Sequence, residues 1–433
     1  MAIRPVDAIE GEGGRRAKSV GVLQPWRATA AEEPSRPSAH GLDWFVFFLA
    51  DVQVGFGPFV AVYLTTQKWT LVEIGLVLSI SGLVALIGQM PGGAIVDWAR
   101  SERLVAGIAV AAIGLSALAY AALPIFPVIL AASVIHAASS CVLGPAIAAI
   151  SLGLVGRHGL SFRLGRNARF ASLGSGVAAA AMGVSGYLFS SRAVFLVTVV
   201  LTIPTLLALG HIRSTEIDPD RAHGAAPRRP QAPSATSIAA LARNRPLLIF
   251  ALILALFQLA NAAMLPLAGS IMTMQSGRWA PALIGASMVV PQIVVAAISP
   301  WVGRQAQSRG RHPLLVIGIA ALILRGVLFA FVRDPHLLVA VQILDGVAAA
   351  ILGVLVPLTV ADVTFGTGHF NLAQGTIGTA VGVGASLSTL FAGFLGDRFG
   401  SEAAFLALAA VAGLALTTVW LAMPETRPEN DES

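Results

Sequence analysis

Three ionisable side chains lie deep within long apolar stretches of this 433-residue chain. Asp51, His136 and Asp345 each follow about ten residues of apolar sequence, roughly half the length that crosses a bilayer. A charge at that depth costs about 2.5 kcal/mol or more, so such residues usually serve a function. A carboxylate or an imidazole there can bind and release a proton when its access to water changes. We therefore predict that these three residues bind a proton or another cation.

Structural roles are open for two of these residues. Arg325 lies at a similar depth on the stretch before Asp345 and can neutralise it as an ion pair within a helical hairpin. His136 can instead be a buried histidine that bonds to a neighbouring carbonyl group. Asp51 has no basic residue at its depth in the first two apolar stretches, so it is the strongest candidate for cation binding.

Other polar residues in or beside the apolar stretches are candidates for contacting a small-molecule substrate. The uncharged ones are Gln258, Asn261 and Gln374. A basic cluster that contains Arg166, Asn167 and Arg169 can attract an anionic or zwitterionic molecule. The alternatives are hydrogen bonds between packed helices for the uncharged residues and orientation of the chain in the membrane for the arginines.

The composition indicates a membrane protein. Hydrophobic residues make up 56% of the chain and charged residues 12%, and the mean hydropathy is +0.79. A soluble domain has about 25% charged residues, so this chain has too little polar surface to cover a water-exposed globule. One cysteine excludes a disulfide scaffold, and we predict no metal site.

We predict an all-α membrane protein with twelve transmembrane helices in two pseudo-symmetric six-helix bundles. Each of twelve apolar stretches is near the length that a transmembrane helix needs. They run over 42–65, 73–97, 103–123, 126–152, 166–189, 193–212, 247–269, 281–303, 313–332, 336–360, 370–394 and 401–422. The resulting parts are a disordered tail (1–41), an N-terminal bundle (42–212), a polar central loop (213–246), a C-terminal bundle (247–422) and a second tail (423–433).

The basic residues predict the orientation of the chain. Most of the 28 Lys and Arg residues fall in the tails, the central loop and the loops expected on the same side. The exceptions are Lys68, Arg192, Arg278, Arg333, Arg398 and the intramembrane Arg325. We therefore expect the cytoplasmic membrane as location, with both termini in the cytoplasm, and we attribute the pI of about 10.4 to this topology and not to nucleic-acid binding.

The two halves of the chain share a register of glycines. An offset of 210 residues aligns Gly93 with Gly303, Gly165 with Gly375, and Gly174 with Gly384. Further pairs at the same offset are Gly75 with Gly285, Gly183 with Gly393, and Gly186 with Gly396. One register across two separate regions indicates an internal duplication.

A motif recurs between the second and third stretches of each half. The first copy reads Gly93-Ala-Ile-Val-Asp97-Trp-Ala-Arg100-Ser-Glu-Arg103, and the second reads Gly303-Arg-Gln-Ala-Gln307-Ser-Arg309-Gly310-Arg311-His312. Both copies resemble the G-x-x-x-D-R-x-G-R-R signature of the major facilitator superfamily of secondary transporters. The resemblance extends from about residue 42 to 422 and implies a gating role for this motif, in which Asp97 pairs with a basic residue or caps a helix and glycine permits close approach.

The resemblance implies a monomeric secondary transporter that moves a small molecule across the bilayer by alternating access. It also implies that Asp51, His136, Asn261 and Asp345 lie on helices that line one central cavity. We expect proton-coupled efflux without a cofactor, because no ATP-binding motif is present and a mostly apolar cavity suits amphipathic compounds. The alternatives are proton-coupled uptake of an anionic or zwitterionic metabolite, a receptor without transport, and an intramembrane enzyme; the chain lacks H-E-x-x-H and G-x-S-x-G motifs, so we predict no enzyme.

Overall fold

Helices account for nearly all of the chain that the computed structural model describes, which is residues 34–54, 57–189, 191–225, 241, 243–276 and 279–427. Most of the two expected tails and residues 226–240 of the expected central loop lie outside this part. The backbone of Asp51 is described, but its side chain is not.

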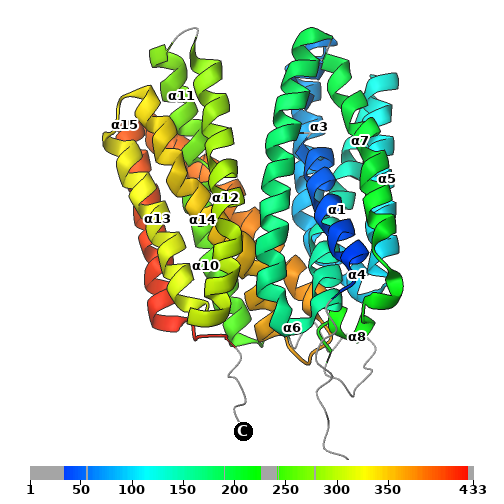
Figure 1. Ribbon diagram of the computed structural model, residues 1–433. Coiled ribbons are helices and arrows are strands. Elements are labelled where there is room, and N and C mark those ends of the chain that lie inside the picture. The colour runs from blue at the N-terminus through cyan, green and yellow to red at the C-terminus, as the bar shows by residue number, and fades with distance from the viewer. Residues whose placement is uncertain are drawn as a thin grey trace, which may run out of the picture. The chain divides into compact units, whose positions relative to one another are not determined.

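The N-terminal bundle is built from seven helices between residues 36 and 211, and together they make six passes (Figure 1). α1 (Arg36–Val54) and α2 (Gly57–Thr66) form the first pass, and α3 (Leu71–Ile87) and α4 (Gln89–Trp98), bent by 48°, form the second. α5 (Glu102–Ala122) and α7 (Ser191–His211) each form one pass. α6 (Phe126–Leu188) contains two passes, because Gly156 reverses the chain with a φ of 64°.

The C-terminal bundle repeats this plan. α10 (Arg245–Asn261) continues into α11 (Met264–Ser276), and α12 (Ala280–Arg309), α13 (His312–Phe331) and α14 (Pro335–Val363) follow as single passes. α15 (Phe370–Ala422) contains two passes that meet at Gly400, where φ is 86°. The fold therefore confirms the prediction of an all-α membrane protein with twelve passes in two six-helix halves.

A count of whole helices gives fewer spans than passes, because α6 and α15 each contain two passes. Eight described helices are long and apolar enough to cross a membrane, or nine if α3 and α4 form one bent span. The remaining passes are the second halves of α6 and α15 and the α1–α2 pair, which flanks two undescribed residues.

Local signals explain where several helices begin. Thr70 and Glu73 form a capping box at the start of α3, and Ser101 caps α5. Asp334 accepts hydrogen bonds from the N–H groups of His336 and Leu337 at the start of α14. Asn244 caps α10, whose first turn contains Pro246.

Each bundle has its own apolar core. The N-terminal core includes Phe45, Tyr63 and Phe195, and the C-terminal core includes Phe250 and Phe405. Ala148, Leu152, Leu160 and Leu164 of α6 belong to the C-terminal core, so α6 is the helix through which the two bundles pack most extensively.

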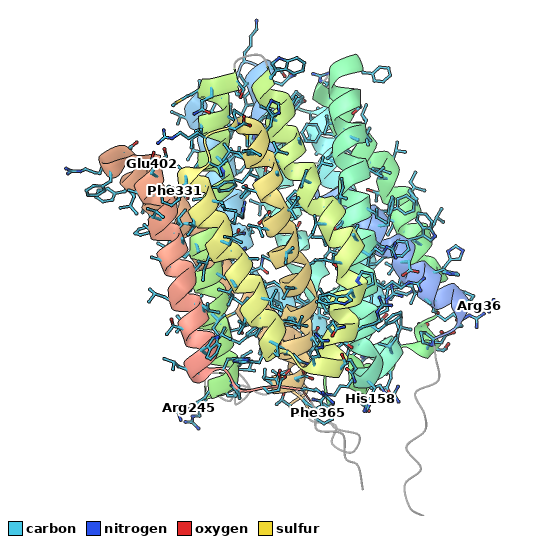
Figure 2. The ribbon with its side chains drawn as sticks, turned by 60° about the vertical axis from the view of Figure 1, so that its left-hand side comes forward. Arg36, His158, Arg245, Phe331, Phe365 and Glu402 are labelled. Atoms are coloured by element: carbon cyan, nitrogen blue, oxygen red, sulfur yellow. The ribbon has the colours of Figure 1, made fainter. Side chains whose placement is uncertain are left out.

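The loops gather at two ends of the helices. Figure 2 shows His158, Phe365 and Arg245 at one end, which we call the basic end, and Phe331 and Glu402 toward the opposite end. Within the expected central loop, the described residues 213–225 form a 3-10 turn (Ser214–Glu216) and a short helix, α8 (Pro219–Ala222), at the basic end. This segment is therefore more ordered than its polar composition indicates.

Candidate functional site

A polar cluster of three residues lies within the C-terminal bundle. Nη1 of Arg325 on α13 lies 2.6 Å from Oδ1 of Asp345 on α14 and 2.6 Å from Oδ1 of Asn261 at the end of α10. Only 1% of Arg325 is exposed, and its guanidinium lies 5.3 Å from the centre of the Phe329 ring. Asp345 is therefore neutralised by Arg325, which is one of the two roles that its position in the sequence allows.

The other predicted uncharged residues separate into two places. Gln258 lies one turn before Asn261 and accepts a hydrogen bond from its side-chain amide at 3.3 Å, so it extends the cluster around Arg325. Gln374 lies near the start of α15, next to Gly375, where α15 contacts α4. Its buried Nε2 atom has no hydrogen-bond partner among the described residues.

His136 lines a cavity of about 330 Å³ in the N-terminal bundle. α3 contributes Leu78, Ser81, Gly82 and Ala85 to its wall. α6 contributes Ser133, His136, Ala137 and Ser140, and Val60 of α2 and Tyr120 of α5 complete the described lining. Most of this surface is apolar, and none of the described lining residues carries a carboxylate, an ammonium or a guanidinium group.

The side of the cavity on α3 faces the other bundle. Gly82 lies one turn before Leu86, which packs against Gly382 of α15, and two turns before Gln89, which contacts Gly375 and Gly378. Gly82 and Leu86 are four residues apart on one face of α3, and Gln89 is the first residue of α4, directly after the bend. The cavity therefore lies beside the interface between the bundles, farther from the basic end than the contacts that Leu86 and Gln89 make.

The predicted basic cluster is held within the N-terminal bundle. Nη2 of Arg163 lies 2.5 Å from Oδ1 of Asp43, and Nε of Arg166 lies 2.9 and 3.0 Å from the two carboxylate oxygens of Asp43. Asn167 accepts a hydrogen bond from Arg163 and donates one to Ser151. The carboxylate of Asp43 thus binds α1 to α6, while the side chain of Arg169 is exposed.

Sequence reasoning did not predict a role for Asp43. This acidic residue lies at the start of the first apolar stretch, a position typical of a residue at the end of a transmembrane helix. It is 1% exposed and paired with two arginines, so Arg166 and Asn167 serve packing in this conformation and do not face the cavity around His136.

Glycines of both motif copies lie where the two bundles touch at the basic end. A Cβ at Gly93 would overlap the carbonyl oxygen of Asn371, and a Cβ at Gly303 would overlap that of Ser161. Gly375 approaches the carbonyl oxygen of Gln89 in the same way, and Gly165 approaches that of Ser299. All four contacts repeat at the 210-residue offset, so the internal duplication extends to the interface itself.

Asp97 lies at the N-terminus of α15. Its Oδ1 atom accepts hydrogen bonds from the backbone N–H and side-chain amide of Asn371 at 3.1 and 2.8 Å, and its Oδ2 atom accepts one from Leu372 N–H at 2.7 Å. The equivalent residue of the second motif copy, Gln307, accepts a hydrogen bond from Ser161 at 3.3 Å. The duplicated interface therefore has a charged contact on one side and a neutral one on the other.

A second charged contact joins the bundles at the basic end. Asp362 at the end of α14 lies 3.2 Å from Nη2 of Arg157 in α6 and 2.9 Å from Nε of Arg311 in its own bundle. Arg311, a residue of the second motif copy, is 2% exposed and also donates to the carbonyl of Ala306. Sequence reasoning did not predict the pairing of Asp362 with Arg157.

Other residues of the motif have different surroundings. Arg100 and Arg309 are exposed, and no ion pair of either is present within the described residues. Gly310 has a φ of 93° and lies against the carboxylate of Glu425. Glu425 accepts hydrogen bonds from the N–H groups of Arg311 and His312; burial opposes ionisation, but these backbone donors hold the pKa of Glu425 below its usual value.

The segment around α8 connects both bundles at the basic end. Ile217 packs on Gly153 of α6, and the carbonyl oxygen of Gly224 accepts a hydrogen bond from Gly366 N–H at 2.8 Å in the loop after α14. Nε2 of His223 lies 3.1 Å from Oε1 of Glu102 at the start of α5. Burial lowers the pKa of His223, but Glu102, the charge of Asp97 and the backbone of Val96 together raise it above its usual value.

Comparisons with known proteins agree with this architecture. The family model described as Major Facilitator Superfamily matches residues 44–277 and 252–433. Curated relatives described as uncharacterized MFS-type transporters of Mycobacterium tuberculosis, strains CDC 1551 / Oshkosh and H37Rv, are 39% identical over 394 residues, covering 90% of this chain and 93% of each relative.

Solved structures share the fold at low sequence identity. The Escherichia coli fucose:proton symporter FucP is 16% identical with a TM-score of 0.71, covering 88% of this chain and 98% of that one. The human organic anion transporter MFSD10 is 16% identical with a TM-score of 0.68, covering 89% of this chain and 100% of that one. Together with the family match and the duplicated helical halves, these likenesses show that the chain belongs to the Major Facilitator Superfamily and is a membrane transport protein, not an enzyme.

Proposed function

We propose that this protein is a monomeric, proton-coupled secondary transporter that exports a small molecule by alternating access. The observation that carries the proposal is the duplicated interface at the basic end, where four glycine contacts repeat between the two bundles. Such contacts are close enough to form one well-defined closed state, yet they join only one end of the helices. Rocking of one bundle against the other would open this end and expose the interior on the other side.

The basic end is the cytoplasmic end in this proposal. Arg157, which precedes His158, pairs there with Asp362, Arg311 of the second motif copy pairs with the same carboxylate, and Arg245 lies at the same end, as the positive-inside rule requires. The structure then corresponds to a conformation that is closed to the cytoplasm, and both termini are cytoplasmic. A bacterial-type inner membrane is the proposed location.

Proton coupling rests on ionisable residues at mid-membrane depth. Asp345 is held by Arg325, and a proton on Asp345 would release Arg325 to another partner, such as Asn261, which already contacts it. Asp51 remains a candidate from its position in α1, and His136 lines the cavity of the other bundle. The energy source would be the proton gradient, with no cofactor.

Proton movement in proteoliposomes tests this function. The purified protein is reconstituted with an internal pH dye, and candidate anionic, cationic, zwitterionic and neutral solutes are added to wild type, Asp51→Asn and Asp345→Asn. Asp397→Asn, at an exposed position on α15, serves as the matched control. A solute-dependent pH change that the control keeps and one of the two variants loses supports coupling at that carboxylate.

Two outcomes would count against parts of the proposal. Labelled solute that crosses without proton movement would indicate a uniporter or a carrier coupled to another ion. Saturable inward uptake driven by an inward proton gradient would replace export with the alternative, a symporter for an anionic or zwitterionic metabolite, which the exposed side chain of Arg169 favours.

A further inference from the structure

We infer that the cavity around His136 binds a neutral, amphipathic molecule about the size of a two-ring aromatic compound, and that such molecules are the transported class. The second part of this inference rests on the proposed function. The first part is a statement about binding that can be tested without transport.

The side chains that line the cavity favour a ligand without charge. The described lining residues carry no Asp, Glu, Lys or Arg, and an imidazole such as that of His136 has no permanent charge, so an ionised ligand would meet no permanent counter-charge among them. The charged pair at similar depth, Arg325 with Asp345, lies in the other bundle and is already matched. An unpaired ion loses its hydration on burial, whereas a neutral molecule keeps the gain from burying its apolar surface.

The size and shape of the cavity suit a molecule with two fused rings. The cavity of about 330 Å³ is roughly twice the volume of an engineered apolar cavity of about 150 Å³ that accepts benzene. Val60, Leu78, Ala85 and Ala137 provide apolar walls, and the ring of Tyr120 is fixed, because its hydroxyl bonds to Ser133 at 2.5 Å. A flat molecule with two fused rings fits this volume and these walls.

The wall of the cavity has a polar group at Ser140. The Oγ atom of Ser140 is buried without a hydrogen-bond partner among the described residues, one helical turn from His136. A buried hydroxyl without a partner is costly, so a ligand that carries one hydroxyl or amide group would bind there preferentially. Together these features describe a ligand with an apolar body and one uncharged polar group.

Calorimetric titration of the full chain in lipid nanodiscs tests the inference with three probes of one shape. 2-Naphthol is neutral at pH 7, 2-naphthoate is an anion and 2-naphthylmethylamine is a cation, and titration of empty nanodiscs corrects for partition into lipid. We expect 2-naphthol to bind at least about tenfold more tightly than either ion, since the described lining residues offer no permanent counter-charge.

Leucine substitutions at Gly82 and Gly75, both on α3, distinguish a loss of binding caused by filling the cavity from a general effect of leucine on this helix. Gly82 lines the cavity and a Cβ there meets no atom within 4 Å, so Gly82→Leu should fill the space and abolish naphthol binding. Gly75, two turns earlier on α3, also has open space around a Cβ but does not line the cavity, so Gly75→Leu should bind like wild type. Leu78→Ala should enlarge the cavity and admit the three-ring analogue 9-anthracenemethanol.

The outcomes distinguish the binding site from the transport mechanism. Equal affinity for the ions, or naphthol binding that survives Gly82→Leu, would overturn the inference whether or not the protein transports. Loss of binding in both glycine variants would also overturn it, because the effect would then not depend on the cavity. The protein could bind the probes in the expected pattern and yet transport no solute in proteoliposomes. That result would support the binding site and contradict the proposed function.

Discussion

Asp97 and Leu372 join the two bundles across 275 positions of sequence, with Oδ2 of Asp97 2.7 Å from the backbone nitrogen of Leu372. The first N–H groups of a helix have no partner within that helix and carry a partial positive charge. A carboxylate from α4 therefore stabilises the N-terminus of α15 only while the basic end is closed. Gln307, its counterpart at the 210-residue offset, has no charge to contribute.

Removing the charge of Asp97 should weaken closure of the basic end. We expect Asp97→Asn to cost the closed state about 1 kcal/mol, a typical value for the loss of a charged helix cap. Cysteines at Ser161 and Gln307, whose side chains lie 3.3 Å apart, report closure by disulfide cross-linking in a Cys141→Ser background. Asp220→Asn is the matched control, because Asp220 on α8 is exposed at the same end. Unchanged cross-linking in Asp97→Asn would contradict a gating role for this carboxylate.

A methyl group at the glycine contacts should hold the bundles apart. Gly93→Ala and Gly375→Ala place a Cβ against a backbone carbonyl of the opposite bundle, and overpacking of this kind costs about 1–3 kcal/mol. We expect both variants to fold, to label faster at a cysteine introduced at Gln307 with an impermeant maleimide, and to transport more slowly. Gly75→Ala, which meets no atom within 4 Å, should behave like wild type. Normal closure in Gly93→Ala would show that α4 and α15 adjust without cost.

Breaking the Arg325–Asp345 pair should destabilise the C-terminal bundle. Arg325→Met alone leaves the partly buried carboxylate of Asp345 without its partner, and removing one partner of a buried ion pair typically costs about 3–5 kcal/mol. The double variant Arg325→Met/Asp345→Leu removes both charges and should recover most of that stability in detergent unfolding. If the double variant folds and still couples transport to protons, Asp345 is not a coupling residue; if it folds and moves solute without protons, the coupling assignment stands.

Docking of the segment around α8 should weaken as the pH at the basic end rises. His223 has a raised pKa in the folded protein, so its stabilising contact is complete below the unfolded value of about 6.5 and is lost as the pH rises through the higher folded value. The groups that face it are Glu102 and Asp97. Hydrogen-exchange protection of Gly366 N–H, which bonds to Gly224, should therefore fall with rising pH. His223→Gln should remove this dependence, His158→Gln should keep it, and an unchanged dependence in His223→Gln would assign it to another group.

The sequence by itself determined the helices, their number and their duplication. In lipid, the backbone N–H and C=O groups of a stretch of about twenty apolar residues find hydrogen-bond partners within a helix. The approximate position of each transmembrane helix therefore follows from local composition. The glycine register was also readable, because close helix approach requires glycine wherever backbones touch. The Asp97 motif predicted a helix cap or an ion pair, and the hairpin of α13 and α14 was short enough to predict the contact of Arg325 with Asp345.

Only the tertiary structure decided which distant charges pair. No Asp or Glu stands between Glu102 and Glu216, so the sequence offers Arg166 no acidic partner nearby, and only the packing of α1 on α6 brings Asp43 to it. The contacts of Arg157 with Asp362 and of His223 with Glu102 likewise join segments that only the packed bundles bring together. The cavity beside His136 depends on volumes left between four helices, which no linear pattern encodes. Local hydrophobicity thus specifies the transmembrane helices. The site is specified by the volumes and charges of side chains on helices that are far apart in the sequence.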